Sequence, residues 1–183
     1  MSRIPTPDSI QTSPEGSRPL LEAVKKQLGS VPNLFRVVGQ SPAALEGYLG
    51  LNAALGKGHI DARLRERIAL VVAENNGCGY CLAAHSYLGA HVAKLDEAEI
   101  ARNRAGRSGD PRAEAALRFA ARVVQQRGHV DDADLAAVRA AGYDDAQIVE
   151  IVVLVALNTL TNYVNSVAGT EIDFPVVRAL SAA

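Results

Sequence analysis

The sequence has neither an excess of one charge nor a long apolar run. Its 19 lysines and arginines nearly balance its 20 acidic residues, so it lacks the basic excess that is typical of nucleic-acid-binding domains. No segment reaches the roughly 18 consecutive apolar residues of a membrane-spanning helix. Residues 1–19 also lack the apolar stretch of a signal peptide. We therefore expect a cytoplasmic protein that binds neither nucleic acid nor a membrane.

Aromatic residues are scarce as well, at 4%, and no segment is a convincing strand. The chain is rich in alanine, leucine and valine, a composition that favours helices. Residues 1–16 are rich in proline, serine and threonine and show no period, which indicates a flexible or wrapping arm. The length of 183 residues suits one domain. We predict a single all-α domain over residues 17–183.

Capping residues and glycines divide the chain into helices. Ser41-Pro42 and Asp110-Pro111 each place a capping side chain before a proline at the first helical position. Glycine ends a helix because it adopts the left-handed conformation without strain. Residues 34–38 are expected to form a short apolar turn. The predicted helices span residues 20–28, 42–55, 62–74, 78–94, 97–102, 111–127, 132–141 and 145–167.

Two of these helices are apolar on every side, at residues 68–73 and 151–157, and such a helix is buried in a large core or by a partner subunit. The two segments also resemble each other. At a shift of 84 residues the same five residue types recur, namely Asp at 61/145, Ala at 62/146, Glu at 66/150, Leu at 70/154 and Val at 71/155. In the second copy, Asn162 and Asn165 occupy the positions that correspond to Cys78 and Cys81. A true repeat predicts two related helical hairpins, one of them reactive. Chance similarity between two apolar segments is the alternative.

The only two cysteines lie in the pattern Cys78-x2-Cys81-x3-His85. Spacings of three and four residues put side chains on one face of a helix, so two thiols and an imidazole can form one cluster. Cys78 would begin the helix, where exposed amides favour a thiolate, and His85 could accept or relay a proton from Cys81. Once one sulfur is oxidised to a sulfenic acid, the other can attack it to form a disulfide. This pattern favours redox chemistry.

Other interpretations of the same residues remain open. The cysteines could be two small buried side chains. They could also bind zinc together with His85, with His91 or His59 as the fourth ligand. A third alternative is a redox sensor or scaffold that uses the cysteine pair as a switch without turnover.

Three neighbouring side chains have two interpretations each. Glu66 and Glu74 lie beside apolar segments, where a carboxyl with a raised pKa can shuttle protons. The alternative is a salt bridge to one of the arginines at 63, 65 and 67, which we favour for Glu74. Tyr80 is either a second hydrogen-bond donor or a packing group, and we favour packing.

The arrangement Glu66-x11-Cys78-x-Tyr80-Cys81-x3-His85 resembles the signature of alkylhydroperoxidase D and the wider carboxymuconolactone decarboxylase family. Asn76-Gly77, ahead of the first cysteine, fits this signature too. Residues 32–35, 162–165 and 170–175 resemble the peroxidase-related branch of that family, so the likeness covers nearly the whole chain.

This resemblance implies an all-helical fold that assembles as trimers or hexamers, and a peroxidase that needs no cofactor or metal. It implies that Cys81 is the peroxidatic thiol and that Cys78 is the resolving thiol, which exchanges with an external dithiol or redox partner protein. His85 and Glu66 would relay protons, and the substrate would be an organic peroxide or hydrogen peroxide. The archetypal peroxidase has a histidine where this chain has Tyr80. Decarboxylase members lack the cysteine pair, so the resemblance does not favour lactone decarboxylation.

Overall fold

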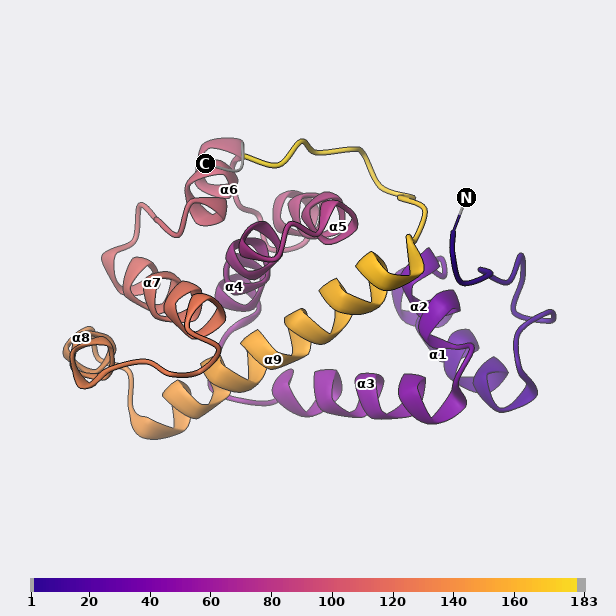
Figure 1. The fold of residues 1–183 in the computed structure, drawn as a ribbon, viewed down its shortest axis with the longest axis horizontal. Helices are drawn as coiled ribbons and strands as arrows, with labels where there is room; N and C mark the ends of the chain where they lie inside the picture. Colours follow the sequence, from indigo (N-terminus) through magenta and orange to yellow (C-terminus); the bar gives the residue numbers. More distant parts are fainter. Residues whose placement is uncertain (1, 181–183) are drawn as a thin grey trace.

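The computed structural model describes residues 2–180, and within this range the chain forms α-helices and one 3₁₀ turn but no strand (Figure 1). The predicted all-α fold is therefore confirmed. The elements are η1 (Glu15–Ser17), α1 (Arg18–Leu28), α2 (Asn33–Val38), α3 (Pro42–Leu55), α4 (Ala62–Asn75), α5 (Gly79–His91), α6 (Glu97–Arg104), α7 (Pro111–Gln125), α8 (Asp132–Ala140) and α9 (Asp145–Ala168).

Most helices begin where the capping residues predict. The side chain of Ser41 accepts a hydrogen bond from the Ala44 amide, and that of Asp61 accepts one from the Leu64 amide. Each bond satisfies an amide that has no partner inside its own helix. Two details differ from the prediction. Residues 33–38 form a helix rather than a turn, and α5 ends at His91 instead of near residue 94.

Helix α4 lies at the centre of the fold and contacts α5, α6, α7 and α9. Its residues 68–73 are all buried, so other helices of the same chain cover the segment that was predicted to be apolar on every side. Burying one large aliphatic side chain stabilises a fold by roughly 1.5–3 kcal/mol. One apolar cluster joins α4 to α7, α8 and α9, and a second joins it to α1, α2, α3 and α5. Both cysteines lie in the second cluster.

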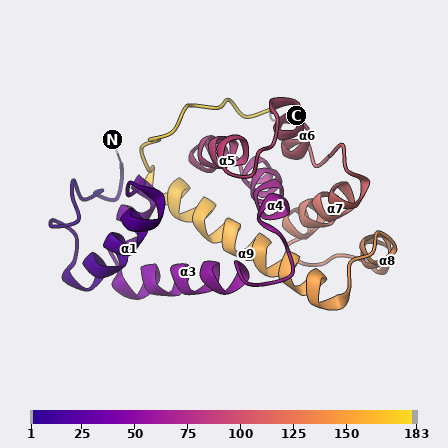
Figure 2. The same ribbon diagram turned by 180° about the vertical axis from the view of Figure 1, so that it is seen from behind.

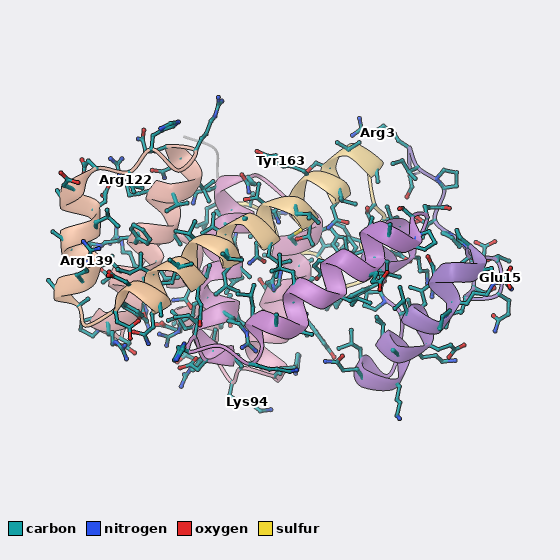
Figure 3. The ribbon with its side chains drawn as sticks, turned by 90° about the horizontal axis from the view of Figure 1, so that it is seen from below. Arg3, Glu15, Lys94, Arg122, Arg139 and Tyr163 are labelled. Atoms are coloured by element: carbon teal, nitrogen blue, oxygen red, sulfur yellow. The ribbon has the colours of Figure 1, made fainter. Side chains whose placement is uncertain are left out.

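Helix α9 is the long diagonal element of Figure 1, and α3 lies beside it (Figure 3). It is one continuous helix of 24 residues, so the second of the two predicted hairpins does not form. The first copy is interrupted at Asn75-Asn76-Gly77, where Gly77 has a φ of +64°. The residues 84 positions later are Thr159-Leu160-Thr161, which contain no glycine to break the helix.

The length and hydropathy of α9 would also suit a membrane span. In this fold, however, 44% of its most apolar 18-residue window is buried inside the protein. A core helix of a soluble domain passes the same test of length and composition.

The N-terminal arm lies against the last turn of α9, where the C-terminal tail begins. The amide of Arg3 donates to the carbonyl of Ala168 over 2.6 Å, which holds the N-terminal arm against the helix end. Figure 3 shows Arg3 at this end. After Gly169 the tail, residues 170–180, turns back across α5 towards α6 (Figures 1 and 2). The tail thus passes over the helix that contains Cys81 and begins directly after Cys78.

Candidate active site

The two cysteines lie at the start of α5, directly after the turn at Gly77. Cys78 is the N-cap residue, and its sulfur accepts a hydrogen bond from the Cys81 amide over 3.3 Å. Both cysteines are free and 2% exposed, and the Cys78 thiol donates to the Cys81 sulfur with 2.6 Å between the sulfur atoms. The two side chains can therefore form a disulfide with little movement of the backbone.

The two thiols differ in acidity. The hydrogen bond from Cys78 lowers the pKa of Cys81, and the charge of His85 and the amides of Asn165 and Asn162 lower it further, although burial opposes them. The pKa of Cys78 is raised, because its proton is held in the bond to Cys81 and its sulfur is buried. Cys81 is thus the sulfur that ionises first, and a thiolate is the reactive form of a cysteine.

His85 and Glu66 form an ion pair between α5 and α4. Nδ1 of His85 lies 2.8 Å from Oε2 of Glu66, and about a fifth of each side chain is exposed. Burial alone would lower the pKa of His85, but the charge and hydrogen bond of Glu66, together with the negative charge on Cys81, raise it. The structure therefore brings together all four residues predicted for the site. Within residues 2–180, no hydrogen bond joins His85 directly to either sulfur.

A cavity of about 610 Å³ opens beside these residues. Cys81, His85 and Glu66 line it, but Cys78 does not. Much of the remaining wall is apolar or aromatic, including Phe35, Tyr48, Leu49, Leu88 and Phe174. A separate cavity of about 730 Å³ beside α7 and α8 contains none of the four site residues. The cavity beside Cys81 is therefore the one where a substrate could meet a reactive thiol.

Tyr80 and Glu74 have their hydrogen-bond partners elsewhere than at the sulfur atoms. The Tyr80 hydroxyl donates to Oδ1 of Asp173 in the tail and accepts from the Leu34 amide. Its ring packs edge-on against Phe174, which agrees with the predicted packing role. Glu74 forms a salt bridge, as favoured, but its partner is Arg104 at 2.7 Å rather than one of the three arginines considered.

The zinc alternative does not fit the arrangement of side chains. In the part of the chain that the structure describes, no three histidine, cysteine or acidic side chains are grouped so that they could bind one metal ion. His59 lies on the surface and pairs with Glu150 at 2.9 Å. His91 packs against the ring of Tyr87, with 4.3 Å between the ring centroids. Neither histidine supplies a further ligand to the cysteine pair.

Two polar residues of the site were not predicted from the sequence. Asn165 of α9 donates through Nδ2 to the Cys81 sulfur over 3.2 Å. Tyr48 of α3 lines the cavity, and its pKa is raised to about 12 by burial and by the negative charges on Cys81 and Glu66. The sequence signals for Asn165 are its position 84 residues after Cys81 and its place in residues 162–165, which resemble the peroxidase-related branch.

Residues 42–122 match the model of the carboxymuconolactone decarboxylase family. This segment contains the acid, both cysteines and the histidine of the site. The predicted family resemblance is confirmed. A protein of Haemophilus influenzae, described as uncharacterized, is 39% identical over 64 residues, which amount to 34% of this chain and 57% of that protein. The match therefore spans little more than half of that relative's length.

Solved structures extend the likeness to nearly the whole chain. A peroxidase-related protein from Ralstonia eutropha JMP134, described as having an alkylhydroperoxidase AhpD core, shares 27% identity with a TM-score of 0.82; the match covers 94% of this chain and 92% of that one. A peroxidase-related protein from Silicibacter sp. TM1040 shares 25% identity with a TM-score of 0.79. That match covers 92% of this chain and 89% of the other. A variant of the debrominase Bmp8, solved with 2,3,4-tribromopyrrole, shares 21% identity with a TM-score of 0.77. That match covers 92% of this chain and 90% of the other, and it shows a likeness of fold alone. The two peroxidase-related structures thus confirm the AhpD-like helical fold over nearly the whole chain.

Proposed function

We propose that this protein is a thiol-dependent peroxidase that reduces organic hydroperoxides or hydrogen peroxide through a dithiol–disulfide cycle of Cys81 and Cys78. The main support is the position of Cys81. Its sulfur has a lowered pKa, lines the cavity and lies 2.6 Å from the sulfur of a second free cysteine. The reaction needs no cofactor, because the two sulfurs carry the electrons.

In the first step, the Cys81 thiolate attacks the terminal oxygen of the peroxide. A sulfur–oxygen bond forms, the oxygen–oxygen bond breaks, and the leaving alkoxide takes a proton from His85 to become an alcohol. Cys81 has then given two electrons to the peroxide and is a sulfenic acid. Glu66 holds the imidazole in place and favours its protonated form.

In the second step, Cys78 loses its proton and attacks the sulfur of the Cys81 sulfenic acid. A sulfur–sulfur bond forms, the sulfur–oxygen bond breaks, and the hydroxide that leaves takes up a proton to become water. An external dithiol or redox partner protein then returns two electrons and two protons by thiol–disulfide exchange. Both thiols are restored for the next cycle.

The test is steady-state peroxide consumption with thioredoxin, glutathione and dihydrolipoamide supplied in parallel as reductants. We expect sustained turnover with at least one of them, and its loss in Cys78→Ser and in Cys81→Ser. Cys78→Ser should still form a sulfenic acid that dimedone labels at Cys81, whereas Cys81→Ser should not be labelled. A protein that is oxidised once and consumes no further peroxide would instead be a redox sensor. Absence of the dimedone adduct in Cys78→Ser would reverse the roles of the two cysteines.

We also propose that the protein works in the cytoplasm as a homo-oligomer. Val149, Tyr163 and Val167 lie along α9 and are each about 60% exposed, which leaves an apolar face for a second copy. Figure 3 shows Tyr163 on the outer side of this helix. Light scattering on the purified protein should give a mass of three or six chains, and Tyr163→Glu should lower it. A monomeric mass at micromolar concentration would contradict this proposal.

A further inference from the structure

Two buried asparagines of α9, Asn165 and Asn162, lie beside the sulfur of Cys81. Asn165 is 3% exposed, and its amide nitrogen donates to that sulfur over 3.2 Å. Asn162 lies one turn earlier and is 1% exposed. Its Oδ1 accepts a hydrogen bond from Asn76 over 2.8 Å. Asn76 lies in the turn that leads to Cys78, so the turn that positions the cysteines also orients this amide.

Each of these amides leaves a polar atom without a partner. Among the described residues, neither Nδ2 of Asn162 nor Oδ1 of Asn165 has a hydrogen-bond partner, and both atoms are buried. A buried polar group that makes no hydrogen bond lowers the stability of a fold. Apolar side chains would therefore suit positions 162 and 165 better if packing were their only role. The amides need another explanation.

We propose that Asn165 and Asn162 form an amide pair that binds the sulfur of Cys81 in its thiolate form and thereby selects it over Cys78 as the attacking sulfur. Asn165 makes the hydrogen bond already seen to the sulfur, and the free N–H group of Asn162 becomes a second donor when the thiolate forms. This proposal rests on the proposed peroxidase, because it assigns further catalytic residues to the same thiol.

Neutral amides suit this position better than a cation would. A thiolate that is 2% exposed has lost most of its contact with water, so hydrogen bonds must replace that solvation. Hydrogen bonds to an ionised group are stronger than bonds between neutral groups. An amide supplies them without burying a second charge, and donors that are already oriented need no rearrangement when charge develops. Both amides lower the pKa of Cys81, which agrees with this role.

The pair also contributes to the difference between the two sulfurs. Asn165 lowers the pKa of both thiols and Asn162 that of Cys81 alone, and the hydrogen bond from Asn165 goes to Cys81. Cys78 keeps its proton and donates it to the same sulfur. Cys81 can therefore receive three donors: the Cys78 thiol and the two amides. It is also the cysteine that lines the cavity. The donors thus stabilise negative charge on the sulfur that a substrate can reach.

The test measures the ionisation of Cys81 without any peroxide. In the Cys78→Ser background only one thiol remains, and its rate of alkylation by iodoacetamide across pH reports the thiolate fraction. We expect Asn165→Leu to move the midpoint of this profile upward and to slow alkylation below the midpoint about tenfold, since a bond to a charged group is worth about one pKa unit. Asn165→Asp keeps the size of the side chain but places a carboxylate beside the sulfur, so it should move the midpoint further in the same direction. Asn162→Leu should have a smaller effect in that direction.

The matched control is Asn158→Leu. Asn158 is another buried asparagine of α9 and lines the same cavity, but its amide donates to the backbone carbonyl of Leu154 and not to a sulfur, so the midpoint should not move. An unchanged midpoint in both Asn165 variants, with a normal circular dichroism spectrum in at least Asn165→Asp, would overturn the amide pair. The outcome is separate from the proposed function. A shifted midpoint in a protein that never reduces peroxide supports the amide pair and rejects the peroxidase. Sustained peroxide turnover with an unshifted midpoint supports the peroxidase and rejects the amide pair.

Discussion

The hydroxyl of Tyr80 donates to Oδ1 of Asp173 over 2.8 Å, which ties helix α5 to the C-terminal tail. The other oxygen of the same carboxylate accepts a hydrogen bond from the Asn33 amide at the start of α2. The adjacent Phe174 packs against the rings of Tyr80 and Tyr87 and lines the cavity beside Cys81. One carboxylate therefore holds the tail against the wall of the candidate active site.

Replacing Asp173 by alanine should loosen this part of the tail. The change removes two hydrogen bonds of about 0.5–1.5 kcal/mol each, so opening of the tail should become on the order of tenfold more frequent. Two measurements check this. Hydrogen exchange of the Asn33 backbone amide should become faster, and trypsin should cleave faster after Arg178. Glu171→Ala is the matched control, because the Glu171 side chain has no hydrogen bond within residues 2–180. Equal exchange at Asn33 in both variants would show that the carboxylate does not hold the tail.

The rate of peroxide reduction should depend on pH through two groups. Attack needs the Cys81 thiolate, whose pKa is lowered, so activity should rise with pH at values below the ordinary thiol pKa of about 8.5. Donation to the leaving oxygen needs protonated His85, whose pKa is raised, so activity should fall only at pH values above the ordinary histidine pKa of about 6.5. The profile of kcat/KM should therefore be bell-shaped. A flat profile between pH 5 and 9 would contradict the assigned roles.

Glu66→Gln should move the falling side of this profile to lower pH. Glutamine removes the charge that favours protonated His85, so the imidazole loses its proton more easily. Because His85 itself remains, we expect kcat/KM at neutral pH to fall by less than the roughly 10²–10⁴-fold that a general acid usually contributes.

A matched control exists in the same fold. Glu150 stands 84 residues after Glu66 and also pairs with a histidine, since Oε1 lies 2.9 Å from Nδ1 of His59. That histidine lies on the surface and does not line the cavity beside Cys81. Glu150→Gln should therefore leave the pH profile unchanged. A similar loss in both glutamine variants would mean that the effect of Glu66 comes from stability rather than from proton transfer.

Much of the helix pattern and the cysteine cluster could be predicted because the signals are local. The break at Asn75-Asn76-Gly77 places Cys78 at a helix start, and the spacing of three brings Cys81 to the same face. His85 follows one turn later by the same geometry. None of these relationships depends on how distant helices pack.

The partners that come from distant parts of the chain could not be derived in this way. Asn165 reaches Cys81 only because α9 crosses α5, and Asp173 reaches Tyr80 only because the tail turns back after Gly169. The repeat at a shift of 84 residues paired Asn165 with Cys81 in sequence but gave no reason for contact. It also predicted a second hairpin, where the continuous helix α9 forms instead.

Outside the candidate site, the structure predicts how the protein loses stability in acid. Glu99 of α6 is 5% exposed and lies 3.3 Å from the buried guanidinium of Arg67 on α4. Burial alone would raise the pKa of this carboxyl, but hydrogen bonds from Ser108, the Gly109 amide and Asn103 help to lower it to about 2. A folded-state pKa below the unfolded value means that the charged group stabilises the fold above the unfolded pKa of about 4.3. This stabilisation is lost as the pH falls from there towards about 2.

Glu99→Gln should therefore lower the free energy of unfolding at pH 7 by about 3 kcal/mol, because it leaves the Arg67 charge buried without its nearest partner. The difference from the unchanged protein should shrink as the pH falls below about 4, because Glu99 then takes up a proton in the unfolded chain and, only near pH 2, in the folded protein as well. Urea denaturation at pH 7 and at pH 3 measures both values. Glu97→Gln, an exposed acid of the same helix, should change stability by less than about 0.5 kcal/mol at either pH. An equal loss for Glu99→Gln at the two pH values would show that the side chain acts through its shape rather than its charge.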